Sequence, residues 1–303
     1  MLDLVHDGAA RHKAPMDADT PFDRRLRRQR RDRAAPRFAS ANYLHRLMAD
    51  ELLDRLALVK RDFIDALDLG CADGHLADRL RSLGLTVTCS DAGFRFAGRC
   101  APDGMTVQCD EDRPAFGDGS FDLIMSVGVL DSVNDLPGAL VLARKMLRPD
   151  GLFLAAFLGA GSLPRLRAAM MAADAVTGGA APHIHPQIDV RAAGDLLTRA
   201  GFALPVADST SLTVRFPALA TLVGDLRATA ATNILTARSR RPILRAGLAA
   251  AEAEFARHAD LDGKIEEQVE IVHLTAWAPA PGQPKPARRG SGTTSLAAVL
   301  RPS

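Results

Sequence analysis

The chain has 303 residues, of which 47% are hydrophobic and 24% are charged, and its formal net charge is +2. This is the composition of an ordinary globular protein, and so small a charge argues against a general nucleic-acid-binding surface. No apolar run reaches the ~18–20 residues that a membrane span needs, and the N-terminus lacks the apolar core of a signal peptide. We therefore expect a cytoplasmic protein with one large domain and extensions.

The chain begins with a polar segment that we expect to be loosely ordered. The arginine-dense stretch FDRRLRRQRRDRAAPRF, residues 22–38, follows it. As a helix this stretch would be charged on nearly every side, which indicates either a solvated helix or a contact for an acidic partner. We interpret residues 1–39 as an arm that docks a protein. Residues 42–59 have leucines at helical spacing and predict an amphipathic helix.

From residue 64 onward, short apolar runs alternate with helical patterns. Such alternation predicts βαβ units and a parallel sheet whose strands are buried on both faces. The expected strands are IDALDLG, TVTCSD, MTVQCD, FDLIMSVGV and LFLAAFLG, and the helices between them include HLADRLRSLG and DLPGALVLARKMLRPDG. The sequence therefore predicts an α/β fold.

After residue 160 the pattern is less regular, and we expect helical insertions that form a lid over the sheet. The lid segments are residues 160–190 and 217–260, inside a domain that spans residues 40–279. LTVRF and EQVEIVHLTAWAP are the late strands, and the tail 280–303 is rich in proline and glycine, which favours an extended arm. No internal repeat is present.

The four cysteines have no CxxC pairing and no regular spacing. They are Cys71, Cys89, Cys100 and Cys109, and three of them lie in or beside predicted strands. Free thiols in such places pack as small apolar groups. The spacing therefore predicts neither a disulfide framework nor a zinc site, and we expect no metal.

The stretch ALDLGCADGHL reads as a strand, a glycine-bearing turn and a helix. Ligands of open α/β sheets bind beyond the carboxyl ends of the strands, which is where this turn lies. Gly70 and Gly74 would let the backbone approach a ligand closely. Ala72 departs from a regular G-x-G-x-x-G pattern and is tolerated without strain only if its φ is negative.

Three aspartates lie at or near the ends of the expected strands, at the same edge of the sheet. Asp91 closes the second strand, where a carboxylate can accept hydrogen bonds from both hydroxyls of a ribose. Asp110 ends the third strand, within reach of an adenine amino group. Asp68 could hold the glycine loop or bind the ammonium group of a ligand. The three together predict an adenosine-binding site.

These motifs resemble the class I S-adenosylmethionine-dependent methyltransferases. The resemblance rests on DLGCADG, the SD that ends the second strand, CDEDRPAFGDGSFDLIMS and LRPDG. It implies a Rossmann-like, seven-stranded, mostly parallel sheet with its last strand antiparallel, and S-adenosyl-L-methionine as cofactor. It also places Gly70 and Gly74 at the methionine, Asp91 at the ribose, and Asp110 and Glu111 near adenine.

A closer resemblance, covering nearly the whole chain, is to the complex I assembly factor 5 group and its bacterial relatives. FDRRLRRQRRDRAA, VNDLPGAL, PHIHP, DLRATAATN and PARRGSGTTS carry it. The mitochondrial member of this group is described as a protein arginine hydroxylase of a respiratory iron–sulfur subunit. Asp131-Ser132 stands where relatives often have His-Trp, so the substrate and the chemistry do not transfer directly.

Two kinds of chemistry have candidate residues. For methyl transfer, Asp131 or His183 could act as the general base, and Asn233 could form hydrogen bonds in the lid. For hydroxylation, an iron site would need two histidines and a carboxylate. The two candidate sets are His183 and His185 with Asp189, and His258 and Asp260 with His273.

We therefore predict a methyltransferase-like enzyme that acts on a protein arginine in complex I assembly. The open alternatives are an arginine hydroxylase on the same fold, a non-catalytic assembly factor and a small-molecule methyltransferase. The expected partner is a complex I iron–sulfur subunit.

Overall fold

The computed structural model describes residues 20–284, and these contain one seven-stranded sheet of order β3-β2-β1-β4-β5-β7-β6. β7 runs antiparallel to both of its neighbours, and the pairs on the β3 side of β5 are parallel. This confirms the predicted Rossmann-like α/β fold. The strands are β1 Asp65–Leu69, β2 Thr86–Asp91, β3 Thr106–Gln108, β4 Phe121–Val127, β5 Leu147–Leu158, β6 Ala203–Phe216 and β7 Ile265–Trp277.

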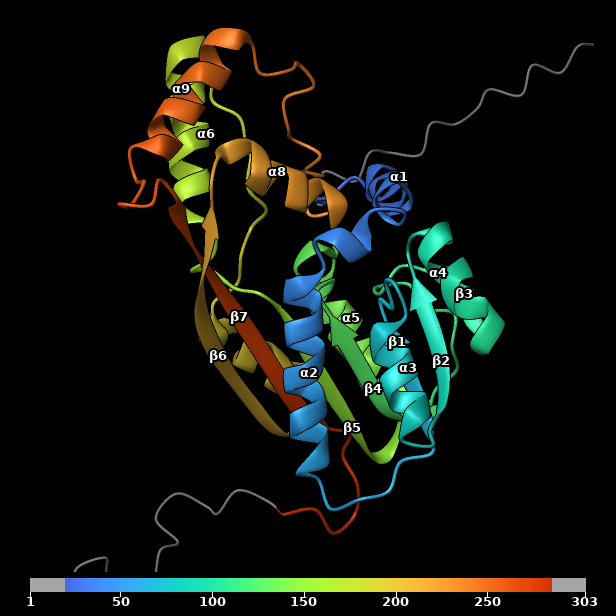
Figure 1. The fold of residues 1–303 in the computed structure, drawn as a ribbon. Coiled ribbons are helices and arrows are strands. Elements are labelled where there is room, and N and C mark those ends of the chain that lie inside the picture. The colour runs from blue at the N-terminus through green and yellow to red at the C-terminus, as the bar shows by residue number, and fades with distance from the viewer. Residues whose placement is uncertain (1–19, 285–303) are drawn as a thin grey trace, which may run out of the picture.

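Helices cover both faces of the sheet (Figure 1). α2 and α3 pack on one face, and α5 and α7 pack on the other. Successive residues of a strand point to opposite faces, so Ala66 joins the first layer while Leu67 and Leu69 join the second. The helices are α1 Arg24–Ala34, α2 Tyr43–Ala57, α3 His75–Ser82, α4 Phe94–Cys100, α5 Leu136–Met146, α6 Pro164–Thr177, α7 Val190–Arg199, α8 Leu219–Ala228 and α9 Arg245–Ala256.

α6, α8 and α9 rise beyond the ends of β6 and β7, as Figure 1 shows. They share their own apolar cluster, which includes Ala169, Leu222 and Phe255. The start of α6 is held by the buried carboxylate of Glu267, which accepts hydrogen bonds from the backbone amides of Arg165 and Leu166. These helices lie within the two stretches that we expected to form a lid.

α1 differs from the expected solvated or docking helix. Arg27, Arg31 and Ala34 are buried against the domain, and Asp23 caps the helix by accepting from the amide of Leu26. The pairing of its arginines with acids of the same chain, described below, explains why so polar a helix can pack. The terminal segments 1–19 and 285–303, with the PARRGSGTTS motif, lie outside the described residues.

Three local predictions need correction. α5 ends at Met146, and residues 147–151, which we had assigned to the end of that helix, begin β5. β6 starts at Ala203 and not near residue 212, because a polar edge strand that pairs only with β7 leaves little apolar pattern in the sequence. α4 was not predicted. Among the described residues, no helix is both long and apolar enough to cross a membrane.

Candidate functional site

The glycine loop lies between β1 and α3, at the carboxyl edge of the sheet, as expected. Ala72 has a φ of +46°, so the condition for a strain-free alanine at this position is not met. A left-handed alanine costs on the order of 1–2 kcal/mol. That conformation directs the Ala72 amide to a carboxylate oxygen of Asp91, at 3.1 Å. The loop is therefore tied to the end of β2.

The two loop glycines are required by packing within the chain. Gly70 has a φ of +93°, and a Cβ on it would lie 2.5 Å from the side chain of Val129. Gly74 has a φ of +85°, and its Cβ would lie 3.1 Å from the Sγ atom of Cys100. Close contact with neighbouring side chains thus accounts for both glycines without a ligand.

Asp91 is fully buried and already has four hydrogen bonds from this chain. Arg31 from α1 donates to both carboxylate oxygens, with Nε 2.7 Å from Oδ1. The amides of Ala72 and Gly93 also donate to it. The guanidinium of Arg31 therefore contacts the two oxygens that we expected to bind ribose hydroxyls.

The adenine-side acids are paired in the same way with successive turns of α1. Arg27 donates to both oxygens of Glu111, at 2.7 and 2.9 Å. Arg28 donates to Asp110 at 2.6 Å. Arg24 pairs with the next acid, Asp112. In this structure α1 thus closes the adenosine half of the candidate site.

The expected methionine subsite is small. A cavity of about 20 Å³ lies against the glycine loop, and its lining includes Asp68, Gly70 and His45. Such a volume holds about one water molecule. Asp68 is buried, and its Oδ2 atom has no hydrogen-bond partner. Burial raises the pKa of Asp68 well above its ordinary value.

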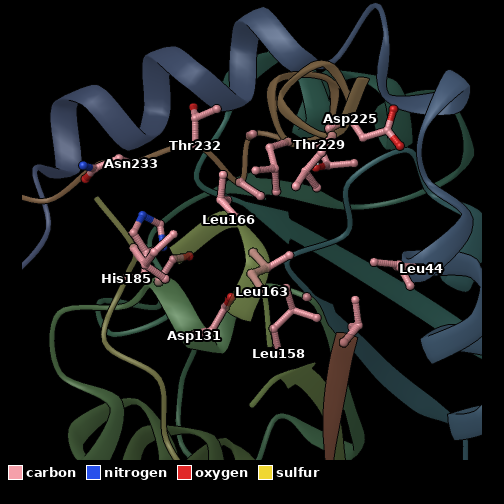
Figure 2. A pocket seen from close by; sticks show the side chains of 18 of the residues that line it. Leu44, Asp131, Leu158, Leu163, Leu166, His185, Asp225, Thr229, Thr232 and Asn233 are labelled. Carbon is pink, nitrogen blue, oxygen red and sulfur yellow. The ribbon is translucent and has the colours of Figure 1, made fainter. Parts of the chain in front are cut away.

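A larger cavity of about 240 Å³, here called the acceptor pocket, lies between the sheet and the lid helices. Figure 2 shows Asp131 and His185 at one end and Asp225 and Leu44 at the other, with Leu163 and Leu166 between them. His45 lines both this pocket and the small cavity. The two spaces are therefore neighbours.

Both predicted bases line the acceptor pocket, but in different environments. Asp131 forms no salt bridge among the described residues, and burial raises its pKa to about 6. His183 is held by Asp174 of α6, with its Nε2 atom 2.9 Å from the carboxylate. Asp131 is the better candidate because its carboxylate is not engaged by a charged partner.

Four of the motifs that carry the closer resemblance meet around this pocket. Phe22 packs edge-to-face on His185, with ring centroids 5.0 Å apart, and exchanges backbone hydrogen bonds with the side chain of Asn134. His185 accepts from the amide of Ile234. Asn233 donates to the carbonyl of Pro182 at 2.7 Å, which is the lid hydrogen bond that we expected.

Neither predicted iron set converges. His183 faces Asp174, His185 packs on Phe22, and Asp189 caps α7 by accepting from the amide of Ala192. In the second set the three side chains have different partners. These are Glu254 for His258, Arg215 for Asp260 and Glu51 for His273.

Comparison with known proteins agrees with this architecture. The profile of the methyltransferase domain family matches residues 40–205, more than half of the chain. The chain belongs to this methyltransferase family. The arginine-hydroxylase NDUFAF5 of Danio rerio is 33% identical to it, over 91% of this chain and 88% of that protein. The resemblance seen in the sequence motifs is thereby confirmed.

One further relative and one solved structure extend this comparison. Malonyl-[acyl-carrier protein] O-methyltransferase of Laribacter hongkongensis is 30% identical, over 82% of this chain and 87% of that protein. The crystal structure of YcgJ from Bacillus subtilis superposes with a TM-score of 0.54 at 13% identity, covering 78% of this chain and all of the other. YcgJ shows that the methyltransferase domain here has a known fold.

Sequence reasoning missed three residues of the candidate site. Arg31 and Arg27 were read only as part of a charge run, since nothing local indicates that α1 folds back onto the sheet. His45 looked like one residue of an amphipathic helix. His45 is half-buried, its buried Nδ1 atom has no partner, and desolvation lowers its pKa to about 4. A histidine on the apolar side of a helix was the available signal.

Proposed function

We propose that this protein binds S-adenosyl-L-methionine at the carboxyl edge of β1, β2 and β4. We further propose that it modifies an arginine side chain of a respiratory complex I subunit. Two carboxylates at this edge suit the polar groups of the cofactor. Asp68 has a buried carboxylate oxygen without a partner at the methionine subsite, suited to an ammonium group. Asp91 ends β2, where its carboxylate can accept from ribose hydroxyls once Arg31 moves.

The observation that carries the arginine proposal is the unpaired carboxylate of Asp131 in the acceptor pocket. The acids Asp91, Asp110, Glu111 and Asp112 all have arginine partners from α1. Asp131 has no such partner among the described residues, and unlike Asp68 it lines the acceptor pocket. A carboxylate in an apolar surrounding is the group that binds a guanidinium most strongly. The relatives named arginine-hydroxylase add independent support.

The cofactor supplies an electrophilic methyl group on its sulfonium. If a guanidinium nitrogen took up this methyl group as the carbon–sulfur bond broke, that nitrogen would have to lose one proton. Asp131 can hold the guanidinium by two hydrogen bonds and accept that proton, since its pKa of about 6 keeps it largely ionised at neutral pH. Leu158, Leu163 and Leu166 line the centre of the pocket and would limit the access of water to such a guanidinium.

Mass spectrometry of a complex I iron–sulfur subunit, co-expressed with this protein, tests the proposal. Wild type should add one methyl group to an arginine, and Asp131→Asn should abolish the addition. Arg25→Met, which changes an exposed arginine of α1, is the matched control and should behave as wild type. A gain of one oxygen would instead establish hydroxylation, which the names of the relatives favour.

Two other functions each have an observation in their favour. The acceptor pocket is lined mainly by aliphatic side chains, which suits an acyl or other apolar small molecule, as the malonyl-carrier relative suggests. Methylation of a malonyl thioester in place of the protein would support that function. The closed pairing of Arg31 with Asp91 favours an assembly factor without turnover. Tight subunit binding with no change in mass would support it.

A further inference from the structure

Three of the four cysteines meet directly behind the glycine loop. Cys71 belongs to the loop, Cys89 to β2 and Cys100 to the end of α4, and all three are buried. Their Sγ atoms all lie within 4.8 Å of one another, and those of Cys71 and Cys100 are 3.5 Å apart. Within residues 20–284, no other set of three histidine, cysteine or acidic side chains converges in this way.

The size of this sulfur triangle matches that of a three-coordinate metal site. A zinc–sulfur bond is about 2.3 Å, so three sulfurs in a plane around the ion are about 4.0 Å apart. The 3.5 Å between Cys71 and Cys100 and the upper limit of 4.8 Å for all three sulfurs bracket that value. A disulfide needs sulfurs about 2.05 Å apart, much closer than these.

A cation lies against one of the three thiols. The guanidinium of Arg81 contacts the Sγ atom of Cys89 at 3.5 Å, and a neighbouring cation stabilises a thiolate. Thiols release their protons when they bind a metal ion, so the ion itself supplies the drive to form the thiolates.

We infer that Cys71, Cys89 and Cys100 form a binding site for one soft d¹⁰ cation of the Zn²⁺, Cd²⁺ or Cu⁺ class. Soft thiolate ligands select such ions. A divalent ion displaces the protons that the three sulfurs carry and leaves the site with one net negative charge, which Arg81 balances. No oxidant or reductant takes part.

This site does not depend on the proposed enzymatic function. It would fix Cys71, and with it the glycine loop, to β2 and α4. The spacing of these cysteines in the sequence fits no zinc motif, and for that reason the sequence predicted no metal. Parallel packing of β1 and β2 and the return of α4 bring them together.

Titration of the reduced, full-length protein with Cd²⁺ tests the inference. We expect one equivalent to produce the ultraviolet charge-transfer band of cadmium–thiolate bonds and to raise the melting temperature. Cys89→Ser should weaken binding by at least about 100-fold, since loss of an outer-shell partner alone costs 10–100-fold. Cys109→Ser is the matched control because Cys109 is equally a buried free thiol but lies outside the cluster.

Two results would overturn the inference. One is the absence of a saturable band in wild type, which would show that the thiols only pack as apolar groups. The other is equal loss of the band in Cys109→Ser and Cys89→Ser, which would place the binding elsewhere. If Cys89→Ser does not fold by circular dichroism, Cys100→Ala replaces it, because removal of that ligand must weaken binding to the same extent.

Discussion

Replacing Arg31 by methionine removes the guanidinium that contacts Asp91 while keeping much of the apolar stem of the side chain. Removal of one partner from a buried ion pair typically costs about 3–5 kcal/mol, because the other charge is left without compensation. Asp91 retains the amide hydrogen bonds from Ala72 and Gly93. We therefore expect the lower end of that range, about 3 kcal/mol of lost free energy of unfolding.

The same substitution is expected to strengthen cofactor binding. In wild type, ribose hydroxyls must compete with Arg31 for the two oxygens of Asp91. A hydrogen bond to a charged group contributes about 1.5–3 kcal/mol. Opening this pair therefore lowers the affinity of wild type by about 10- to 100-fold, at about 1.4 kcal/mol for each factor of ten. Arg31→Met should recover that factor.

Isothermal titration calorimetry with S-adenosylhomocysteine, at a temperature where every variant is folded, measures this change. Arg25→Met changes an exposed arginine of the same helix and should leave both affinity and stability at wild-type values. Asp91→Asn should bind more weakly than wild type. The reasoning fails if Arg31→Met binds as weakly as Asp91→Asn, because Arg31 would then orient Asp91 for the ribose and not compete with it.

Three other substitutions test separate parts of the structure. Gly70→Ala should lower the free energy of unfolding by more than about 2 kcal/mol, because it adds left-handed backbone strain and a clash with Val129. Chemical denaturation should show that the double variant Gly70→Ala with Val129→Ala recovers part of this loss. If the double variant recovers none of it, backbone strain alone is responsible. Burial raises the pKa of half-buried Asp131 from 3.8 to about 6, so its ionisation opposes folding above about pH 6 and has no effect below about pH 4. Asp131→Asn should thus be more stable than wild type by about 2 kcal/mol at pH 7.5 and equally stable near pH 4. The whole pKa shift corresponds to roughly 3 kcal/mol, and we expect less because the side chain is only half-buried. Urea denaturation at the two pH values measures the difference, and a difference that does not depend on pH would contradict the reasoning. Glu51→Ala removes the hydrogen-bond partner, at 2.6 Å, of the Nε2 atom of fully buried His273. Thermal unfolding should show a loss of stability of about 1–3 kcal/mol for Glu51→Ala and a smaller loss for Glu51→Gln. Equal losses of stability in the two variants would contradict the pairing.

The strand and helix pattern followed from the sequence because hydrophobic periodicity is a local property. Buried runs such as FDLIMSVGV and the turn glycines determined where β4 and the glycine loop form. The polar edge strand β6 was underestimated for the same reason, since exposed residues of a strand show little apolar pattern. Asp91 and Asp68 were placed correctly at the carboxyl edge, because parallel strands end on the same side.

What the sequence by itself determined is therefore the α/β fold, its family and the edge of the sheet that carries the acids. Tertiary structure alone decided the partners of those acids. Arg31 and Asp91 are far apart in the chain, and only the return of α1 onto the sheet brings the guanidinium to the carboxylate. The three clustered thiols and the position of Asp131 in the acceptor pocket depend in the same way on packing between distant segments, which no local pattern encodes.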